Sequence, residues 1–275
     1  MNTEPRSGRA IDDWNEHWAA HAAVNALNPA QIYRTKLVLE ALALGEAIAP
    51  LRVLELGSGT GEFAGQVMGL RPDAEFVGLD LSAVGVEISR RKVPAARFFE
   101  QDFRQPIQLD PSYRGWATHV VCSEVLEHLD DPVAMLRKMR ALLAPGCRVI
   151  VTVPAGPMSA FDRHIGHRRH FNPSLLEETL RAAGLEVVDL RGAGFPFFNL
   201  YRLTVVARGK KLIEDTAGAT ERVLPIAARG AIRTFSWLFK LNTARTKLGW
   251  QLVAVGVEPN NSPKTSRPEL QGSPR

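Results

Sequence analysis

The feature that most constrains this chain is a glycine-rich loop set between a short apolar run and a helical pattern. Residues 53–63 read Val-Leu-Glu-Leu-Gly-Ser-Gly-Thr-Gly-Glu-Phe, so Gly57, Gly59 and Gly61 alternate with small residues. Glycine adopts positive φ without a steric penalty and lets the backbone approach a ligand closely. We therefore expect a strand that turns sharply into a helix here, with a ligand seated on the turn.

Short apolar runs alternate with helical patterns along most of the chain. Alternation of this kind predicts a parallel sheet wound by helices. The predicted strands are 52–56, 75–79, 96–99, 119–123, 148–153, 186–190 and 250–258. The predicted helices among them are 61–70, 84–92, 132–143 and 172–183.

The remaining segments differ from this pattern. Both ends are rich in Pro, Ser, Asn and charge, which predicts disordered tails. The apolar spacing after the first tail fits two helices broken near Asn28 and Pro29. We expect tails at 1–10 and 259–275, N-terminal helices at 11–50 that cap the ligand site, a core at 51–194 and 249–258, and a helical insertion at 195–248.

The net charge of +5 is concentrated in the insertion, which carries ten Lys or Arg and three acids. The rest of the chain is slightly acidic, so the charge does not mark the core as a nucleic-acid binder. The two cysteines, Cys122 and Cys147, lie in apolar runs, which argues against a disulfide framework. With no apolar run long enough for a bilayer and no secretory signal, we expect a cytoplasmic protein.

One segment of the insertion, 222–240, reads as a cationic amphipathic helix. Its basic stripe lies opposite an apolar face, and Trp237 lies beside the stripe. Such a helix packs its apolar face on the sheet or on a second copy in a homodimer, or serves as a lid or a peripheral membrane contact for an apolar acceptor. The basic stripe comprises Arg222, Arg229, Arg233 and Lys240.

Two carboxylates extend the glycine loop into a nucleoside site. Asp80 ends the second strand, where a carboxylate can accept both hydroxyls of a ribose, and Asp102 follows the third strand, where it could receive an adenine amino group. The loop reads Gly-x-Gly-x-Gly after Glu55, which differs from the Gly-x-Gly-x-x-Gly of dinucleotide sites.

From Tyr33 to Glu258 the chain resembles class I S-adenosylmethionine-dependent methyltransferases. The resemblance rests on the loop, Asp80, Asp102, the run Ser-Glu-Val-Leu-Glu-His at 123–128, and Leu-Ala-Pro-Gly at 143–146. It implies a Rossmann-like, doubly wound, mostly parallel seven-stranded sheet with N-terminal helices and a helical insertion before the last strand. It also implies S-adenosyl-L-methionine as the cofactor.

The resemblance further assigns residues to that cofactor. Glu55 would face the methionine amino group, and backbone atoms near Cys122 would line the methionine arm. Arg34 would face the methionine carboxylate, although a solvated arginine on a helix face is an alternative. The implied cofactor residues are Arg34, Glu55, Gly57, Ser58, Gly59, Gly61, Asp80, Leu81, Asp102, Phe103, Cys122 and Ser123.

Two clusters after neighbouring strands are candidates for the acceptor chemistry. Glu124, Glu127 and His128 follow the fourth strand, and a segment rich in His and Arg at 162–170 follows the fifth. Because the carboxyl ends of parallel strands meet at one edge, both clusters should face the methyl group. The candidate catalytic residues are His128, His167, Glu124 and His170.

The run Glu-x-x-Glu-His is similar to the metal-binding motif of the plant small-RNA 2′-O-methyltransferase and of ubiquinone-biosynthesis O-methyltransferases. That similarity implies a divalent metal ion whose ligands would be Glu124, Glu127, His128 and His167. The alternative is that His128 or His167 accepts a proton without a metal. Arg168 and Arg169, beside His167, would weaken a cation site unless the acceptor is anionic, and they could clamp such an acceptor or be surface charges on a lid.

These features predict methyl transfer to a small-molecule acceptor, most simply at oxygen, by in-line displacement. An RNA methyltransferase is one alternative, but no RNA-binding module or aromatic array for stacking bases occurs, so nucleic acid is not the expected partner. A lipid-linked acceptor at a membrane surface is another alternative. A non-catalytic cofactor-binding protein is a third, against which the intact Glu55, Asp80 and histidines argue.

Overall fold

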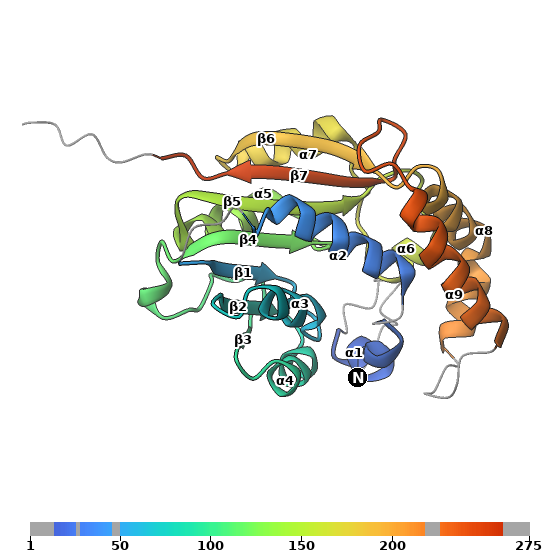
Figure 1. Cartoon of the computed structure of the whole chain (residues 1–275), viewed down its shortest axis with the longest axis horizontal. Coiled ribbons are helices and arrows are strands. Elements are labelled where there is room, and N and C mark those ends of the chain that lie inside the picture. The colour runs from blue at the N-terminus through green and yellow to red at the C-terminus, as the bar shows by residue number, and fades with distance from the viewer. Residues whose placement is uncertain (1–13, 26–27, 46–49, 218–225, 261–275) are drawn as a thin grey trace, which may run out of the picture.

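The computed structural model describes residues 14–25, 28–45, 50–217 and 226–260, and its centre is a seven-stranded sheet with helices on both faces (Figure 1). The strand order is β3-β2-β1-β4-β5-β7-β6, and β7 runs antiparallel to the other six strands. The predicted mostly parallel, doubly wound sheet is confirmed. The strands are β1 (Arg52–Leu56), β2 (Glu75–Asp80), β3 (Arg97–Glu100), β4 (Ala117–Ser123), β5 (Leu143–Pro154), β6 (Glu186–Ala193) and β7 (Gln251–Val257).

Several helices begin where the sequence offers a capping side chain. Asn28, Ser82, Asp131 and Asn172 each accept a hydrogen bond from a backbone N–H in the first turn of the helix that follows. The helices are α1 (Trp14–Asn25), α2 (Pro29–Leu42), α3 (Glu62–Leu70), α4 (Ala83–Lys92), α5 (Pro132–Met139), α6 (Ala160–His164), α7 (Pro173–Ala182), α8 (Phe197–Ala217) and α9 (Ile226–Leu238), and the 3₁₀ turns are η1 (Pro111–Tyr113), η2 (Leu126–His128), η3 (Arg140–Leu142) and η4 (Phe239–Leu241).

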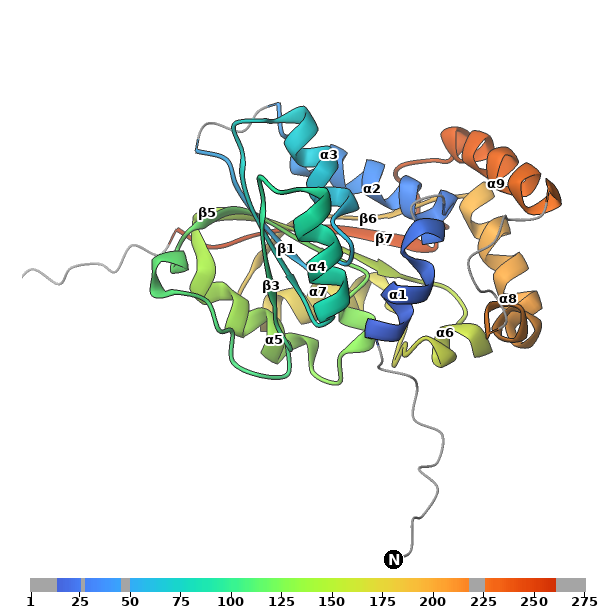
Figure 2. The ribbon, with the colours of Figure 1, turned by 90° about the horizontal axis from the view of Figure 1, so that it is seen from below.

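Alternate residues of the central strands pack in two hydrophobic cores, one on each face of the sheet. Leu54 and Val120 pack in the core covered by α5 and α7, whereas Val53 and Val121 pack in the core covered by α2 and α3 (Figure 2). Burial on both faces explains why these strands are continuously apolar.

The boundary between the predicted helix 132–143 and the strand that follows it was wrong. The α-helix ends at Met139, and β5 begins at Leu143, five residues before the predicted start. Pro145 and Gly146 are typical of a turn, but β5 continues through them as an irregular strand, with Gly146 at φ +74° and a change of register opposite Ala117 and His119.

The helices of the insertion lie beyond the carboxyl ends of β1, β4 and β5, at the same end of the molecule as α1 and α6 (Figure 1). The predicted amphipathic helix begins at Ile226 in the described chain, so Arg222 lies outside the described residues. Phe235 on its apolar side packs on Tyr201 of α8, while Arg233 and Lys240 are exposed. No helix in the described ranges is both long and apolar enough to cross a bilayer.

Candidate active site

The glycine loop joins β1 to α3 in a conformation that side chains would oppose. Gly57, Gly59 and Gly61 have φ of +78°, +53° and +78°. A Cβ on Gly57 would lie 2.5 Å from Cγ2 of Val125, so this position has neither the conformation nor the space for a side chain. The predicted sharp turn from strand to helix is confirmed.

Glu55, near the end of β1, brings a buried carboxylate under the loop. Its Oε2 finds no hydrogen-bond partner in the described part of the chain, and the same is true of the Ser58 hydroxyl. Burial raises the pKa of Glu55 well above its usual range, and the nearby carboxylates of Asp80 and Glu62 raise it further. A positively charged ligand group placed here would supply the missing partner.

Asp80 ties the end of β2 to the loop. Its Oδ2 accepts from the backbone N–H of Gly59 at 2.7 Å, and its Oδ1 accepts from Ser82 at 2.9 Å. Burial raises the pKa of Asp80, and these two hydrogen bonds oppose that shift. Leu81, which follows it, is half-buried. The carboxylate thus lies at the loop, where the sequence predicted it.

Asp102 lies in the loop after β3, on the outer side of this site. The guanidinium of Arg104 contacts it at 2.9 Å and holds its pKa below the ordinary value. The neighbouring Phe103 is buried in the core covered by α5 and α7. Of this pair, the carboxylate rather than the ring is therefore available to a ligand.

The N-terminal helix α1 covers the loop through residues whose individual contacts were not predicted from the sequence. A Cβ on Gly59 would lie 2.8 Å from the ring of Trp18. The Oδ1 of Asn15 accepts from the Ser82 hydroxyl at 2.8 Å. Trp14 stands edge-on to the imidazole of His128, with ring centroids 5.0 Å apart. Two tryptophans spaced one helical turn apart were the available signal.

The end of β4 carries the other predicted cofactor residues. Cys122 is buried in the strand, and the Ser123 hydroxyl is 2.8 Å from that of Thr152. Arg34 is only 16% exposed and faces Glu124, with Nη1 3.6 Å from Oε2, so it is not a solvated helix-face arginine. Its Nε is buried with no hydrogen-bond partner among the described residues.

Glu124 and Glu127 do not point to one site. Glu124 has φ +57°, and its Oε1 accepts from the Gln251 amide at 2.8 Å and from the Thr152 hydroxyl at 3.2 Å. Together with Arg34, these contacts hold its carboxylate within a polar network. Glu124 is therefore not among the ligand-capable groups that lie within 4.8 Å of one another at Glu127, although its charge raises the pKa of Glu127.

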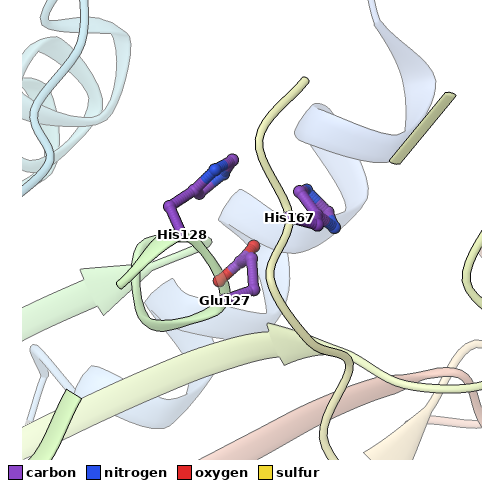
Figure 3. Close-up of side chains that lie close together, drawn as sticks. All are labelled: Glu127, His128 and His167. Carbon is purple, nitrogen blue, oxygen red and sulfur yellow. The ribbon is translucent and has the colours of Figure 1, made fainter. Parts of the chain in front are cut away.

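Glu127, His128 and His167 form a cluster (Figure 3). Glu127 and His128 come from η2, and His167 comes from the loop after α6. One ligand-capable atom of each lies within 4.8 Å of the others. Glu127 is completely buried, and within the described ranges neither of its carboxylate oxygens nor Nδ1 of His128 has a hydrogen-bond partner. Buried polar atoms in this state are rare unless something else binds them.

Burial sets the protonation of this cluster. It lowers the pKa of His128 to about 4 and that of His167 to about 3, and it raises the pKa of Glu127 well above its usual range. Both imidazoles are therefore neutral at pH 7, and each keeps a nitrogen lone pair. His170 lies behind His167, with its Nε2 3.2 Å from Nδ1 of His167.

Arg168 and Arg169 donate hydrogen bonds to backbone carbonyls at the end of η2, next to the cluster. Nε of Arg168 donates to the carbonyl of His128 at 2.8 Å, and Arg169 donates to the carbonyls of Leu129 and Asp130 at 3.2 and 2.8 Å. These bonds hold the end of η2 against the loop after α6. Arg168 and Arg169 were predicted to clamp an anionic acceptor or to be surface charges on a lid, and neither prediction describes these contacts.

Comparison with known sequences identifies the kind of domain. A family described as a methyltransferase domain matches residues 30–190. A ubiquinone biosynthesis O-methyltransferase of Marinobacter nauticus is 28% identical over 177 residues, which span 57% of this chain and 73% of that protein. A protein of the same name from Xanthomonas euvesicatoria is 28% identical over 211 residues, 69% of this chain and 84% of its own length.

Solved structures share the fold. A chain from the Haloferax volcanii complex of the Trm112 methyltransferase activator with a methyltransferase superposes with a TM-score of 0.59 at 18% identity, covering 91% of this chain and 99% of that one. Phosphoethanolamine N-methyltransferase 2 of Haemonchus contortus, in complex with S-adenosyl-L-methionine, gives 0.55 at 16% identity, covering 82% of this chain and 52% of that one.

Proposed function

Because the chain belongs to the methyltransferase-domain family and is a class I S-adenosylmethionine-dependent methyltransferase, we propose that it methylates an oxygen nucleophile of a small-molecule acceptor held at Glu127, His128 and His167. The observation that carries this proposal is the completely buried carboxylate of Glu127, whose oxygens have no partner in the described chain. The similarity to O-methyltransferases supports oxygen as the methylated atom.

The cofactor side of the proposal follows from buried groups around the loop. We assign the methionine ammonium to Glu55, whose Oε2 lacks a partner among described residues, and the methionine carboxylate to Arg34. Asp80 takes the ribose hydroxyls, and Asp102 takes the adenine amino group. The remaining proposed contacts are the small side chains of Ser58 and Ser123 and backbone atoms of Gly57, Ser58, Gly59, Gly61, Leu81, Phe103, Cys122 and Ser123.

The acceptor side of the proposal includes a divalent cation held by Glu127, His128 and His167. Two neutral imidazoles and a buried carboxylate suit such an ion, and catalytic sites commonly use three protein ligands. When bound, the ion would lower the pKa of the acceptor hydroxyl. Glu124, the fourth ligand expected from the sequence, is held by Gln251, Thr152 and Arg34 instead.

The low histidine pKa values favour a ligand role over a proton-acceptor role. A general base works best when its pKa is near the working pH, and values of about 3 and 4 make His167 and His128 weak bases at pH 7. The chain's own part is then to orient the acceptor and exclude water. The acceptor hydroxyl would lose its proton to solvent before transfer. Its oxygen would then bond to the methyl carbon as the carbon–sulfur bond breaks, and the cofactor would leave as a neutral thioether.

The test is transfer of a labelled methyl group to a panel of hydroxylated and aminated small molecules by exhaustively chelated protein, with magnesium, manganese or zinc added back. The proposal predicts labelled O-methyl products that depend on one of these ions. Turnover that is unchanged by chelation would remove the metal, and methylation of amines alone would remove the oxygen acceptor. A salt-dependent RNA shift assay separates the RNA alternative.

A lipid-linked acceptor at a membrane surface is a second candidate, favoured by the surface of the insertion. Exposed basic residues, among them Arg233, Lys240 and Lys247, accompany exposed large apolar side chains there. Co-sedimentation with anionic vesicles at low salt tests this candidate, and absence of binding removes it. The exposed large apolar residues in the described part of the insertion are Phe195, Leu200, Leu203, Trp237, Leu241 and Leu248.

A further inference from the structure

One cation of the insertion, Arg202, contacts the segment that carries His167 and His170. Nη2 of Arg202, on α8, donates to Oδ1 and Oδ2 of Asp162 at 2.9 and 3.0 Å. Asp162 is completely buried, and the side chain of Arg202 is 14% exposed. The pair therefore joins the insertion to the segment that carries His167 and His170.

Asp162 organises that segment through several bonds. Its Oδ2 accepts from the backbone N–H and the hydroxyl of Ser159, both at 2.7 Å, which closes the capping box of α6. Its backbone carbonyl accepts from the N–H of His167 at 2.9 Å. Its Oδ2 also lies 3.9 Å from Nε2 of His170. A shift of this side chain would therefore disturb both histidines.

The partners of the two imidazoles define their tautomers. Nδ1 of His170 lies 3.0 Å from the carbonyl oxygen of Gly156, which can only accept, so this nitrogen carries the proton. Nε2 of the neutral ring must then accept, and the group 3.2 Å away is Nδ1 of His167. His167 is therefore protonated on Nδ1, which leaves its Nε2 with a lone pair.

The position of Arg202 is itself fixed by packing in the insertion. The ring of Tyr201, the preceding residue, packs on Phe235 of α9 and Phe239 of η4, with centroids 5.3 and 5.8 Å apart. Phe239 also packs on Tyr33 of α2. The aromatic cluster thus packs α8 against α9, η4 and, through Phe239, α2, which fixes the part of α8 that carries Arg202.

We propose that Arg202 is a positioning residue, which holds Asp162 and through it the His170–His167 pair in the arrangement that presents the Nε2 lone pair of His167. The insertion is then a working part of the active site and not only a cover for it. This inference rests on the proposed role of His167 as a site residue. Groups that hydrogen-bond to a ligating histidine, as His170 does to His167, typically change metal affinity or activity 10- to 100-fold when lost, and Arg202 would act through them.

The test compares Arg202→Met with Arg245→Met in the full chain. Arg245 also lies in the insertion and contacts an aspartate, Asp189, at 2.8 Å, so its loss removes the same charge and one ion pair away from the site. Two-bond ¹H–¹⁵N spectra report the imidazole tautomers, assigned with His167→Gln and His170→Gln. Titration with Mn²⁺, followed by electron paramagnetic resonance, reports cation affinity.

Arg202→Met should lose the single-tautomer pattern of His167 and His170 and bind Mn²⁺ about 10- to 100-fold more weakly, whereas Arg245→Met should match the wild type. The proposal would be overturned by a folded Arg202→Met protein that keeps the wild-type tautomers and binds Mn²⁺ within about twofold of the wild-type affinity. A fall in its melting temperature would not change that conclusion. If Arg202→Met does not fold, Arg202→Lys against Arg245→Lys carries the same comparison, with weaker Mn²⁺ binding expected only for the former.

Failure of the proposed function looks different. A wild-type protein that binds no Mn²⁺ would remove the cation, while the tautomer spectra would still decide the role of Arg202.

Discussion

Replacing Glu127 by methionine should stabilise the metal-free protein while abolishing its cation binding. Glu127 is completely buried, and its two oxygens have no hydrogen-bond partner in the described ranges. Methionine has a similar length and fills the space without polar atoms. The wild type therefore carries a stability cost for this side chain that the variant would not.

The size of this effect follows from the cost of an unsatisfied buried polar group, about 1–3 kcal/mol. We expect Glu127→Met to raise the free energy of unfolding by that amount, or the melting temperature by roughly 3–10 °C for a domain of this size. Because burial raises the pKa of Glu127, its carboxyl contributes most favourably below its unfolded pKa of about 4.3, and that contribution is lost as pH rises through the folded value. The advantage of the variant should therefore grow from pH 5 to pH 8.

The assay is urea unfolding of chelated protein at several pH values, repeated with added Mn²⁺. Added ion should stabilise the wild type in proportion to the logarithm of its concentration and leave Glu127→Met unchanged. Glu258→Met is the matched control, because Glu258 forms an ion pair with Arg140 at 2.6 Å and its loss should destabilise. A Glu127→Met protein that is destabilised by 1 kcal/mol or more, on the order of the desolvation cost itself, would refute the reasoning.

The remaining predictions concern the cofactor loop. S-adenosylhomocysteine binding should weaken as pH falls and should release a proton, because the raised pKa of Glu55 leaves the carboxyl partly protonated before the ammonium arrives. Calorimetry in buffers of different ionisation enthalpy measures the released proton. Glu55→Gln should bind weakly with no such pH dependence, whereas an unchanged pH profile in that variant would exclude Glu55 as the group. Gly59→Ala should lose about 1–2 kcal/mol of stability and at least tenfold in cofactor affinity, because φ is +53° and the added Cβ would meet the Trp18 ring. Gly69→Ala is its control, since a Cβ there meets nothing within 4 Å, and thermal unfolding should show a gain of roughly 0.5–1 kcal/mol.

Much of the fold could be predicted because its signals are local. The strands are short apolar runs whose residues alternate between two cores, and several helices begin at a capping side chain next to a proline. The juxtaposition of His128 and His167 was also predictable, because the carboxyl ends of parallel strands meet at one edge of a sheet. Their ring centroids are 4.7 Å apart.

The parts that could not be predicted depend on single torsions and on tertiary partners. Glu124 and Glu127 lie in one motif, but Glu124 has a positive φ at the end of β4 and a 3₁₀ turn follows it. The Glu124 carboxylate accepts hydrogen bonds from Gln251 and Thr152, whereas the Glu127 carboxylate is buried beside His128 and His167. The bonds of Arg168 and Arg169 to backbone carbonyls depend on how two loops meet. The hydrogen bond from Arg202 to Asp162 joins residues far apart in the chain, so no pattern in the local sequence predicts it.

The most direct test of the central claim is anomalous diffraction from crystals grown with S-adenosylhomocysteine and Mn²⁺. We expect the thioether ligand across the glycine loop, with its amino group at Glu55, and one manganese peak bounded by Glu127, His128 and His167. A peak elsewhere, or none at this cluster at saturating Mn²⁺, would contradict the assigned acceptor site.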